Sequence, residues 1–231
     1  FSRSIGTDPG SGSGGNITLN AGQSITISDG AAVSASTTGP GNAGNININA
    51  DTLMLAGLAS IQANADIGST GQGGSIDVQV RQATLADGSS ITTNTLGLGD
   101  AGSIIVQADE SITLTGFSNI NTSSFDFGTG AGNAGPIRLS APTIELHRGS
   151  IISLSQGPGN AGNIVLGANT IMAGESSISS DTLGPGRGGD ISIHGIGGPS
   201  SRASNVMFSD GTVVSSRGPA TALVVLRPGR K

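Results

Sequence analysis

The chain has 231 residues, which is enough for one domain with a continuous core. It contains no Cys, Trp or Tyr and only 5 Phe against 40 Gly, so the core must be built from Ile, Leu, Val and Ala. The lack of Cys excludes a disulfide framework and a thiolate metal site, and a net charge of −5 argues against a nucleic-acid partner. No apolar run approaches the roughly 20 residues that an integral membrane helix needs.

A repeat of 27–33 residues runs along the chain. Each unit begins with a Gly that is followed, two and four residues later, by apolar residues. The anchor glycines are Gly15, Gly44, Gly74, Gly102, Gly135, Gly162 and Gly189. This period of two predicts a strand with one buried face. The residues expected to stack at its first inward position are Ile17, Ile46, Ile76, Ile104, Ile137, Ile164 and Ile191.

Two more strands are predicted in each unit. The second begins nine or ten residues after the anchor; in the seventh unit it is represented by Val206 and Phe208, which an insertion at 195–205 displaces. The third contributes one strong apolar residue per unit, followed two residues later by a smaller or mixed one. The strong residues are Val33, Ile61, Ile91, Ile120, Ile152, Ile178 and Val214. A Gly-rich corner then closes the unit.

Three short strands that are each buried on one face cannot form a stable unit alone, because a single turn leaves its backbone donors and acceptors unpaired. We therefore predict an all-β fold over residues 1–231, a right-handed parallel β-helix (solenoid) of about seven rungs of 27–33 residues with three strands per rung. A helical solenoid is disfavoured because no window has a period of 3.6, and a β-propeller because its aromatic signatures are missing.

The two ends of the chain are expected to differ from the repeat. Residues 1–14 are interpreted as the tail of a preceding rung, with Ile5 and Thr7 in third-strand positions, so we expect a processed or excised piece that starts in mid-repeat. Residues 218–231 are predicted to hold a terminal strand, Leu223 to Leu226, and a basic tail. This tail and the insertion either cap the rod or precede further turns.

Several segments share one sequence pattern. Gly41 to Ala50, Gly159 to Ala168 and Gly186 to Ile193 follow Gly-Asn-Ala-Gly-Asn-Ile-x-Ile-x-Ala in whole or in part, while Gly88 to Ile91 and Gly149 to Ile152 read Gly-Ser-x-Ile. The repeat resembles the filamentous haemagglutinin-like exoproteins of two-partner secretion systems. The resemblance implies secretion to the cell surface through an outer-membrane transporter partner, a β-helical rod, and roles in adhesion or filament formation.

The densest group of potentially catalytic side chains is Glu145, His147 and Arg148, on the second strand of the fifth unit. Strand alternation places Glu145 and His147 on the outward face, about 7 Å apart. Their stacked neighbours by register are Thr113 and Met172, which add no second carboxylate. We interpret the pair as a solvated surface pair and predict no catalytic residue.

The other candidates are also interpreted as structural. His194 is expected on the outward face beside Asp190, and a single Asp at that repeat position cannot form a calcium ladder, so neither a metal site nor a cofactor is predicted. The insertion carries Ser200, Ser201 and Arg202 and is interpreted as a cap or linker.

Asn and Phe supply two further expectations. Asn recurs after the anchor glycines, and we expect it to hydrogen-bond along the stack and to adopt the left-handed conformation at tight corners. Phe125 and Phe127, in the long corner of the fourth unit, are expected either to tuck under that corner or to stand exposed.

Three functions stay open at this point. The preferred one is an extracellular adhesive or structural rod rather than an enzyme, with cell-surface or matrix glycans or proteins, or further copies end to end, as partners. The alternatives are a polysaccharide-active β-helix, either a lyase or a hydrolase, and a spacer that presents a tip encoded elsewhere. The regular repeat and the lack of a catalytic cluster favour the rod.

Overall fold

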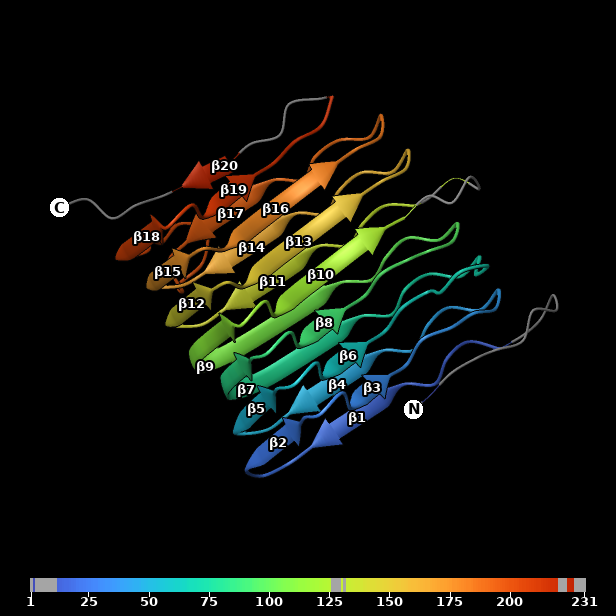
Figure 1. Ribbon diagram of the computed structural model, residues 1–231, viewed down its shortest axis with the longest axis horizontal. Helices are drawn as coiled ribbons and strands as arrows, with labels where there is room; N and C mark the ends of the chain where they lie inside the picture. The colour runs from blue at the N-terminus through green and yellow to red at the C-terminus, as the bar shows by residue number, and fades with distance from the viewer. Residues whose placement is uncertain (1, 3–11, 126–129, 131, 220–223, 227–231) are drawn as a thin grey trace.

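The computed structural model describes residues 2, 12–125, 130, 132–219 and 224–226. In this part of the chain the fold is all-β, without a helix, and parallel strands stack into a solenoid with three strands per turn (Figure 1). The predicted β-helical fold is therefore confirmed. No helix in the described part is long and apolar enough to cross a membrane.

The strands form three stacks, and β7 (Ile76–Leu85) and β9 (Ile104–Thr115) are long enough to belong to the first two of them. The first stack is β1 (Ile17–Asn20), β4 (Ile46–Asn49), β7, β9, β11 (Ile137–Ser140), β14 (Ile164–Gly167), β17 (Ile191–His194) and β20 (Val224–Leu226). The second is β2 (Ser24–Ile27), β5 (Thr52–Leu55), the later parts of β7 and β9, β12 (Thr143–His147), β15 (Thr170–Gly174) and β18 (Asn205–Ser209). The third is β3 (Ala32–Ser34), β6 (Ser60–Gln62), β8 (Ser90–Thr92), β10 (Asn119–Ser124), β13 (Ser150–Ser155), β16 (Ser177–Thr182) and β19 (Val213–Ser215).

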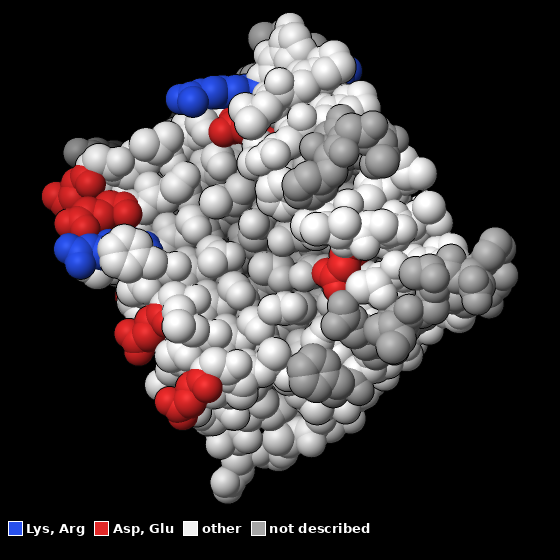
Figure 2. All heavy atoms as spheres, turned by 45° about the vertical axis from the view of Figure 1, so that its right-hand side comes forward, with Lys and Arg blue, Asp and Glu red and all other residues white. Residues whose placement is uncertain are grey.

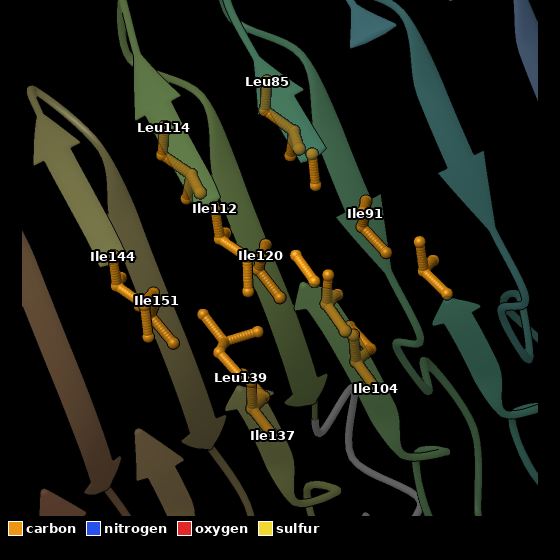
Figure 3. Packing of buried hydrophobic residues seen from close by; sticks show 14 of the residues in the cluster. Leu85, Ile91, Ile104, Ile112, Leu114, Ile120, Ile137, Leu139, Ile144 and Ile151 are labelled. Carbon is orange, nitrogen blue, oxygen red and sulfur yellow. The ribbon is translucent and has the colours of Figure 1, made fainter. Parts of the chain in front are cut away.

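The core contains the predicted isoleucine column. The residues that pair in register from turn to turn are Ile17, Ile46, Ile76, Ile104, Ile137, Ile164 and Ile191. All except the half-buried Ile17 are completely buried. Figure 3 shows Ile104 and Ile137 pointing into the same interior as Ile120 and Leu114 from the other two stacks. One aliphatic core therefore runs through the stack.

The third stack corrects one predicted residue. Ile151, and not Ile152, pairs with Ile120 and Ile178 and is completely buried, while Ile152 is half-buried on the outward side. The reason lies two residues further on. Ser153 is buried, and its hydroxyl accepts a hydrogen bond from the Gly162 N–H at 2.7 Å. An inward Leu154 would leave that N–H without this acceptor, so the polar contact selects the register.

Glycine is required at the corners because the backbones of successive turns approach closely. A Cβ on any anchor after the first would lie well within 3 Å of the carbonyl oxygen of the anchor one turn earlier, a separation that Cβ atoms do not show. These anchors are Gly44, Gly74, Gly102, Gly135, Gly162 and Gly189. A second column, three residues before each of them, is equally tight: Gly41, Gly71, Gly99, Gly132, Gly159 and Gly186.

The expectation for Asn is confirmed in one part and wrong in the other. Asn side chains do bond along the stack, but to backbone: Asn16 Oδ1 accepts the Asn45 N–H at 2.8 Å, and Asn163 Oδ1 accepts the Asp190 N–H at 2.8 Å. No described Asn has a positive φ. The left-handed residues other than Gly all lie between the second and third strands: Asp29, Leu58, Asp87, Phe117, Arg148, Glu175 and Asp210. The left-handed conformation therefore belongs to the turn between the second and third strands, and Asn side chains contribute hydrogen-bond acceptors instead.

After the insertion at 195–205, the chain rejoins the second stack in register. The N–H groups of Ser204 and Asn205 both donate to the Asn169 carbonyl, at 2.7 and 3.0 Å. Beyond them Val206 pairs with Ile171 and Phe208 with Ala173, as predicted.

At the two ends of the chain only part of the predicted structure is described. The terminal strand is present as β20, which pairs with β17. Leu223, Ile5 and Thr7 lie outside the described residues, as does Phe127, whereas Phe125 is half-buried.

Candidate functional site

The outward face of β12 holds the two side chains that the sequence singled out. Glu145 stacks between Thr113 of β9 and Met172 of β15, as expected, and His147 stacks between Thr115 and Gly174. Ile144 and Leu146 are buried on the opposite side, so both polar side chains project outward. In Figure 1 the strands β12, β15 and β18 lie side by side.

A shallow open groove of about 250 Å³ lies on this face. Its walls include Glu145, His147, Met172, Met207 and Asp210. The stacked neighbours Thr113 and Met172 add no carboxylate, as predicted, but the sequence did not reveal that Asp210 reaches the same groove from another turn. Asp210 follows β18 on the left-handed turn, two strands away from β12, and the insertion hid this register.

Gly174 keeps the groove open. It occupies the position between His147 and Ser209 in the stack, where every other residue type would place a side chain. A Cβ built there would lie 3.5 Å from Asp210 Oδ2 and 3.9 Å from His147 Nδ1. The His147 imidazole, the Asp210 carboxylate and the Ser209 hydroxyl, which donates to Asp210 Oδ2 at 2.9 Å, therefore border one notch.

Arg148 is not part of the groove lining. Its left-handed backbone directs the guanidinium along the turn, where Nε donates to Glu175 Oε2 at 2.5 Å and the group lies 5.9 Å from the Phe117 ring centroid. The hydrogen bond from Arg148 lowers the pKa of the Glu175 carboxyl, helped by the charges of Arg148 and His147, and the same bond raises the pKa of Arg148. This pair therefore favours the ionised form of Glu175.

His194 does not stand on the outward surface as expected. The side chain is 3% exposed, Nδ1 lies 2.8 Å from the Gly195 carbonyl oxygen, and Nε2 is buried without a hydrogen-bond partner among the described residues. Its strand neighbour Gly167 provides the space, because a Cβ there would lie 3.1 Å from His194 Cε1. The ring therefore keeps the outward direction that alternation predicts, but it packs over Gly167 and is buried there.

The insertion residues stay apart from the groove. Ser201 Oγ donates to the Gly198 carbonyl at 2.7 Å, within the insertion itself. Neither Ser200, Ser201 nor Arg202 lines the groove.

A second polar cluster, on the first two stacks, was not predicted. Arg81 donates from Nε and Nη2 to the two carboxylate oxygens of Asp51, at 2.8 and 3.0 Å, and from Nη1 to Glu110 Oε2 at 2.7 Å. The hydrogen bond from Arg81 lowers the pKa of Asp51. The available signal was spacing, because Asp51 and Glu110 lie one repeat before and one repeat after Arg81. An open groove of about 430 Å³, lined by Gln79 and Gln107 among others, adjoins the cluster.

These arrangements limit the chemistry of the surface. Among the described residues, no group of three or more His, Cys, Asp or Glu side chains is placed to hold a metal ion. No family model, curated protein or solved structure matches the chain. Function must therefore be argued from the groove and from the repeat itself.

Proposed function

We propose that the chain is a segment of an extracellular structural and adhesive rod. The observation that supports this most is the unbroken parallel register of the first stack, from Ile17 to Ile191. A solenoid lengthens by adding turns without changing its core, and it presents the same faces repeatedly along its axis. This geometry suits a long spacer better than a single deep site.

The exterior supplies repeated polar contacts of the kind that such a rod needs. Asn20, Asn49, Gln79 and Gln107 form a column of exposed amides on four successive turns, spaced by about 4.8 Å. Figure 2 shows a face with few charged side chains, several of them along one edge. Neutral, hydrogen-bonding ladders favour weak contacts with glycans or proteins of a cell surface or matrix, which gain strength by multivalency.

Export and assembly belong to the same proposal. The resemblance to filamentous haemagglutinin-like exoproteins supports secretion through an outer-membrane transporter and display at the cell surface. Parallel stacking also supports end-to-end association, since the terminal strand of a stack carries unpaired backbone donors and acceptors.

Adhesion is tested with the chain coupled to beads at a series of densities and passed over surfaces coated with matrix proteins or glycans. We expect retention to rise steeply with density, and the Gln79→Ala/Gln107→Ala double variant to be retained less. Thr52→Ala/Thr84→Ala, which changes outward positions of the second stack, is the matched control. The proposal would be contradicted if retention depended neither on the coupling density nor on the Gln79 and Gln107 side chains.

Polysaccharide cleavage is the second candidate, and one observation favours it. Glu145, His147 and Asp210 share the groove beside Gly174, which brings an acid–base pair and a second carboxylate together. In a lyase reaction one of these groups would remove the C5 proton next to the uronate carboxyl, and another would protonate the leaving glycosidic oxygen as the C4–O bond breaks. The resulting C4=C5 double bond would absorb ultraviolet light. Incubation with pectic, alginate and glycosaminoglycan polymers tests this: activity that is lost in Glu145→Gln and His147→Ala and kept in Asp109→Asn would favour the enzyme over the rod.

A further inference from the structure

The 3 methionines of the chain all lie in one outward column of the second stack. Met54 stands alone there between Thr26 and Thr84. Met172 and Met207 are direct neighbours on β15 and β18. Met207 is 49% exposed and Met172 is half-buried, so neither side chain is needed to fill the core. Two adjacent thioethers on the outward face therefore have no evident role in the core.

His147 lies diagonally beside this pair of thioethers. It precedes Gly174 in the neighbouring column, and Gly174 follows Met172 by two residues on the same strand face. Because Gly174 has no side chain, His147 Nδ1 lies 3.9 Å from the place that a Cβ would occupy there. Met172, Met207 and His147 all line the same groove.

We propose that Met172, Met207 and His147 bind a soft monovalent cation, Cu(I). Thioether sulfur and neutral imidazole are the donors that Cu(I) prefers, whereas Ca²⁺ and Mg²⁺ require oxygen ligands. Zn²⁺ sites use Cys, His and carboxylate ligands, and among the described residues no three of these are placed to hold a metal ion. The donor set therefore selects the monovalent ion.

The reach of the side chains fits one shared ion. Neighbouring strands lie about 4.8 Å apart, and methionine is unbranched with three rotatable bonds, so two stacked thioethers can turn toward a common point above the groove. The imidazole approaches that point from the β12 side, over Gly174. The carboxylates of Glu145 and Asp210 in the same groove supply the countercharge that the three neutral ligands lack.

This site is independent of the proposed adhesive function. Adhesion relies on repeated outward columns along the rod, whereas the cation site occurs once among the described residues, where a Met pair, a His and a Gly notch coincide. Loss of one function in a variant therefore leaves the other measurable.

Cu(I) affinity is measured anaerobically by competition with a chromophoric Cu(I) chelator. We expect one ion per chain, and we expect Met172→Leu, Met207→Leu and His147→Gln each to weaken binding roughly tenfold or more. Met54→Leu is the matched control, because it removes a thioether of the same column that has no sulfur or imidazole neighbour. Leu replaces Met at similar volume, and circular dichroism confirms the fold of each variant.

A second readout locates the ion. Ag(I), which has the same soft preference and does not change oxidation state, is added while the methionine methyl signals are followed by NMR. The signals of Met172 and Met207 should shift and that of Met54 should not. Wild-type affinity in the Met172→Leu/Met207→Leu double variant, equal loss in Met54→Leu, or displacement of Cu(I) by equimolar Zn²⁺ would each overturn the proposal.

Discussion

At the scale of single residues, the anchor glycines show how strongly backbone packing constrains the sequence. Gly102 stands over the carbonyl of Gly74, and a Cβ there has no room, while a Cβ at Gly22 meets nothing within 4 Å. Gly102 carries the apolar residues two and four positions later that mark an anchor, and Gly22 does not. Close approach, and not chain flexibility, is therefore what an anchor position requires.

Gly102→Ala is expected to destabilise the chain by about 1–3 kcal/mol, because the added methyl forces two turns apart. Gly22→Ala should be neutral or slightly stabilising, since the unfolded chain loses freedom and the native turn has space. Urea unfolding midpoints of the two variants measure the difference. Equal midpoints would show that the corners tolerate wider spacing than the glycine columns imply.

Arg81 offers a test of surface electrostatics at one carboxylate. Its hydrogen bonds lower the folded-state pKa of Asp51, so the stabilising contribution is present above the pKa of the unfolded carboxyl and is lost as pH falls through the folded value. Arg81→Gln should raise the Asp51 pKa toward its ordinary range. NMR titration of the carboxyl carbon measures this, with Arg138→Gln as the control; an unchanged Asp51 titration would mean that the ion pair does not persist in solution.

At the scale of strands, sequence periodicity predicts almost all of the core because only one apolar choice fits each inward position. It fails where two neighbours compete, as with Ile151 and Ile152. Apolar pattern alone cannot separate these two registers, and the decisive contact, from the Gly162 N–H to Ser153, joins residues in different parts of the turn. In the third and fourth turns the two predicted strands are joined into the continuous β7 and β9.

Ile151→Ala and Ile152→Ala test this register directly. The first removes a completely buried side chain and should cost about 2–5 kcal/mol, whereas the second truncates a half-buried outward side chain and should cost less than about 1.5 kcal/mol. Thermal or urea unfolding measures both. The reverse order would restore the register that the apolar pattern suggested.

The candidate site was predictable only in part, for a related reason. Glu145 and His147 share a strand, so simple alternation places them on one face. Asp210 reaches the groove from a turn two strands away, beyond an insertion, and His194 is buried because Gly167 leaves room for its ring. Such contacts depend on turn geometry and on the size of a neighbour one repeat away. The alternation of apolar and polar residues within one strand carries no information on either.

At the scale of the whole molecule, each turn contacts only the turns beside it, so stability should accumulate along the stack rather than arise from one centre. Ile104 lies between β7 and β11 and is completely buried, while Ile17, in β1, pairs with β4 alone in the described part and is half-buried. The same residue type in the same column therefore has two different environments.

Ile104→Ala is expected to cost about 2–5 kcal/mol and to lower the protection of amides on both sides of β9, because a cavity there weakens two interfaces. Ile17→Ala should cost less and should change amide exchange only near β1 and β4. Hydrogen exchange of the 231-residue chain resolves the two patterns, and Thr18→Ala, an exposed neighbour, serves as the control. If both isoleucine variants instead lowered protection uniformly, the chain would unfold as a single cooperative unit, and the turn-by-turn description of its stability would be wrong.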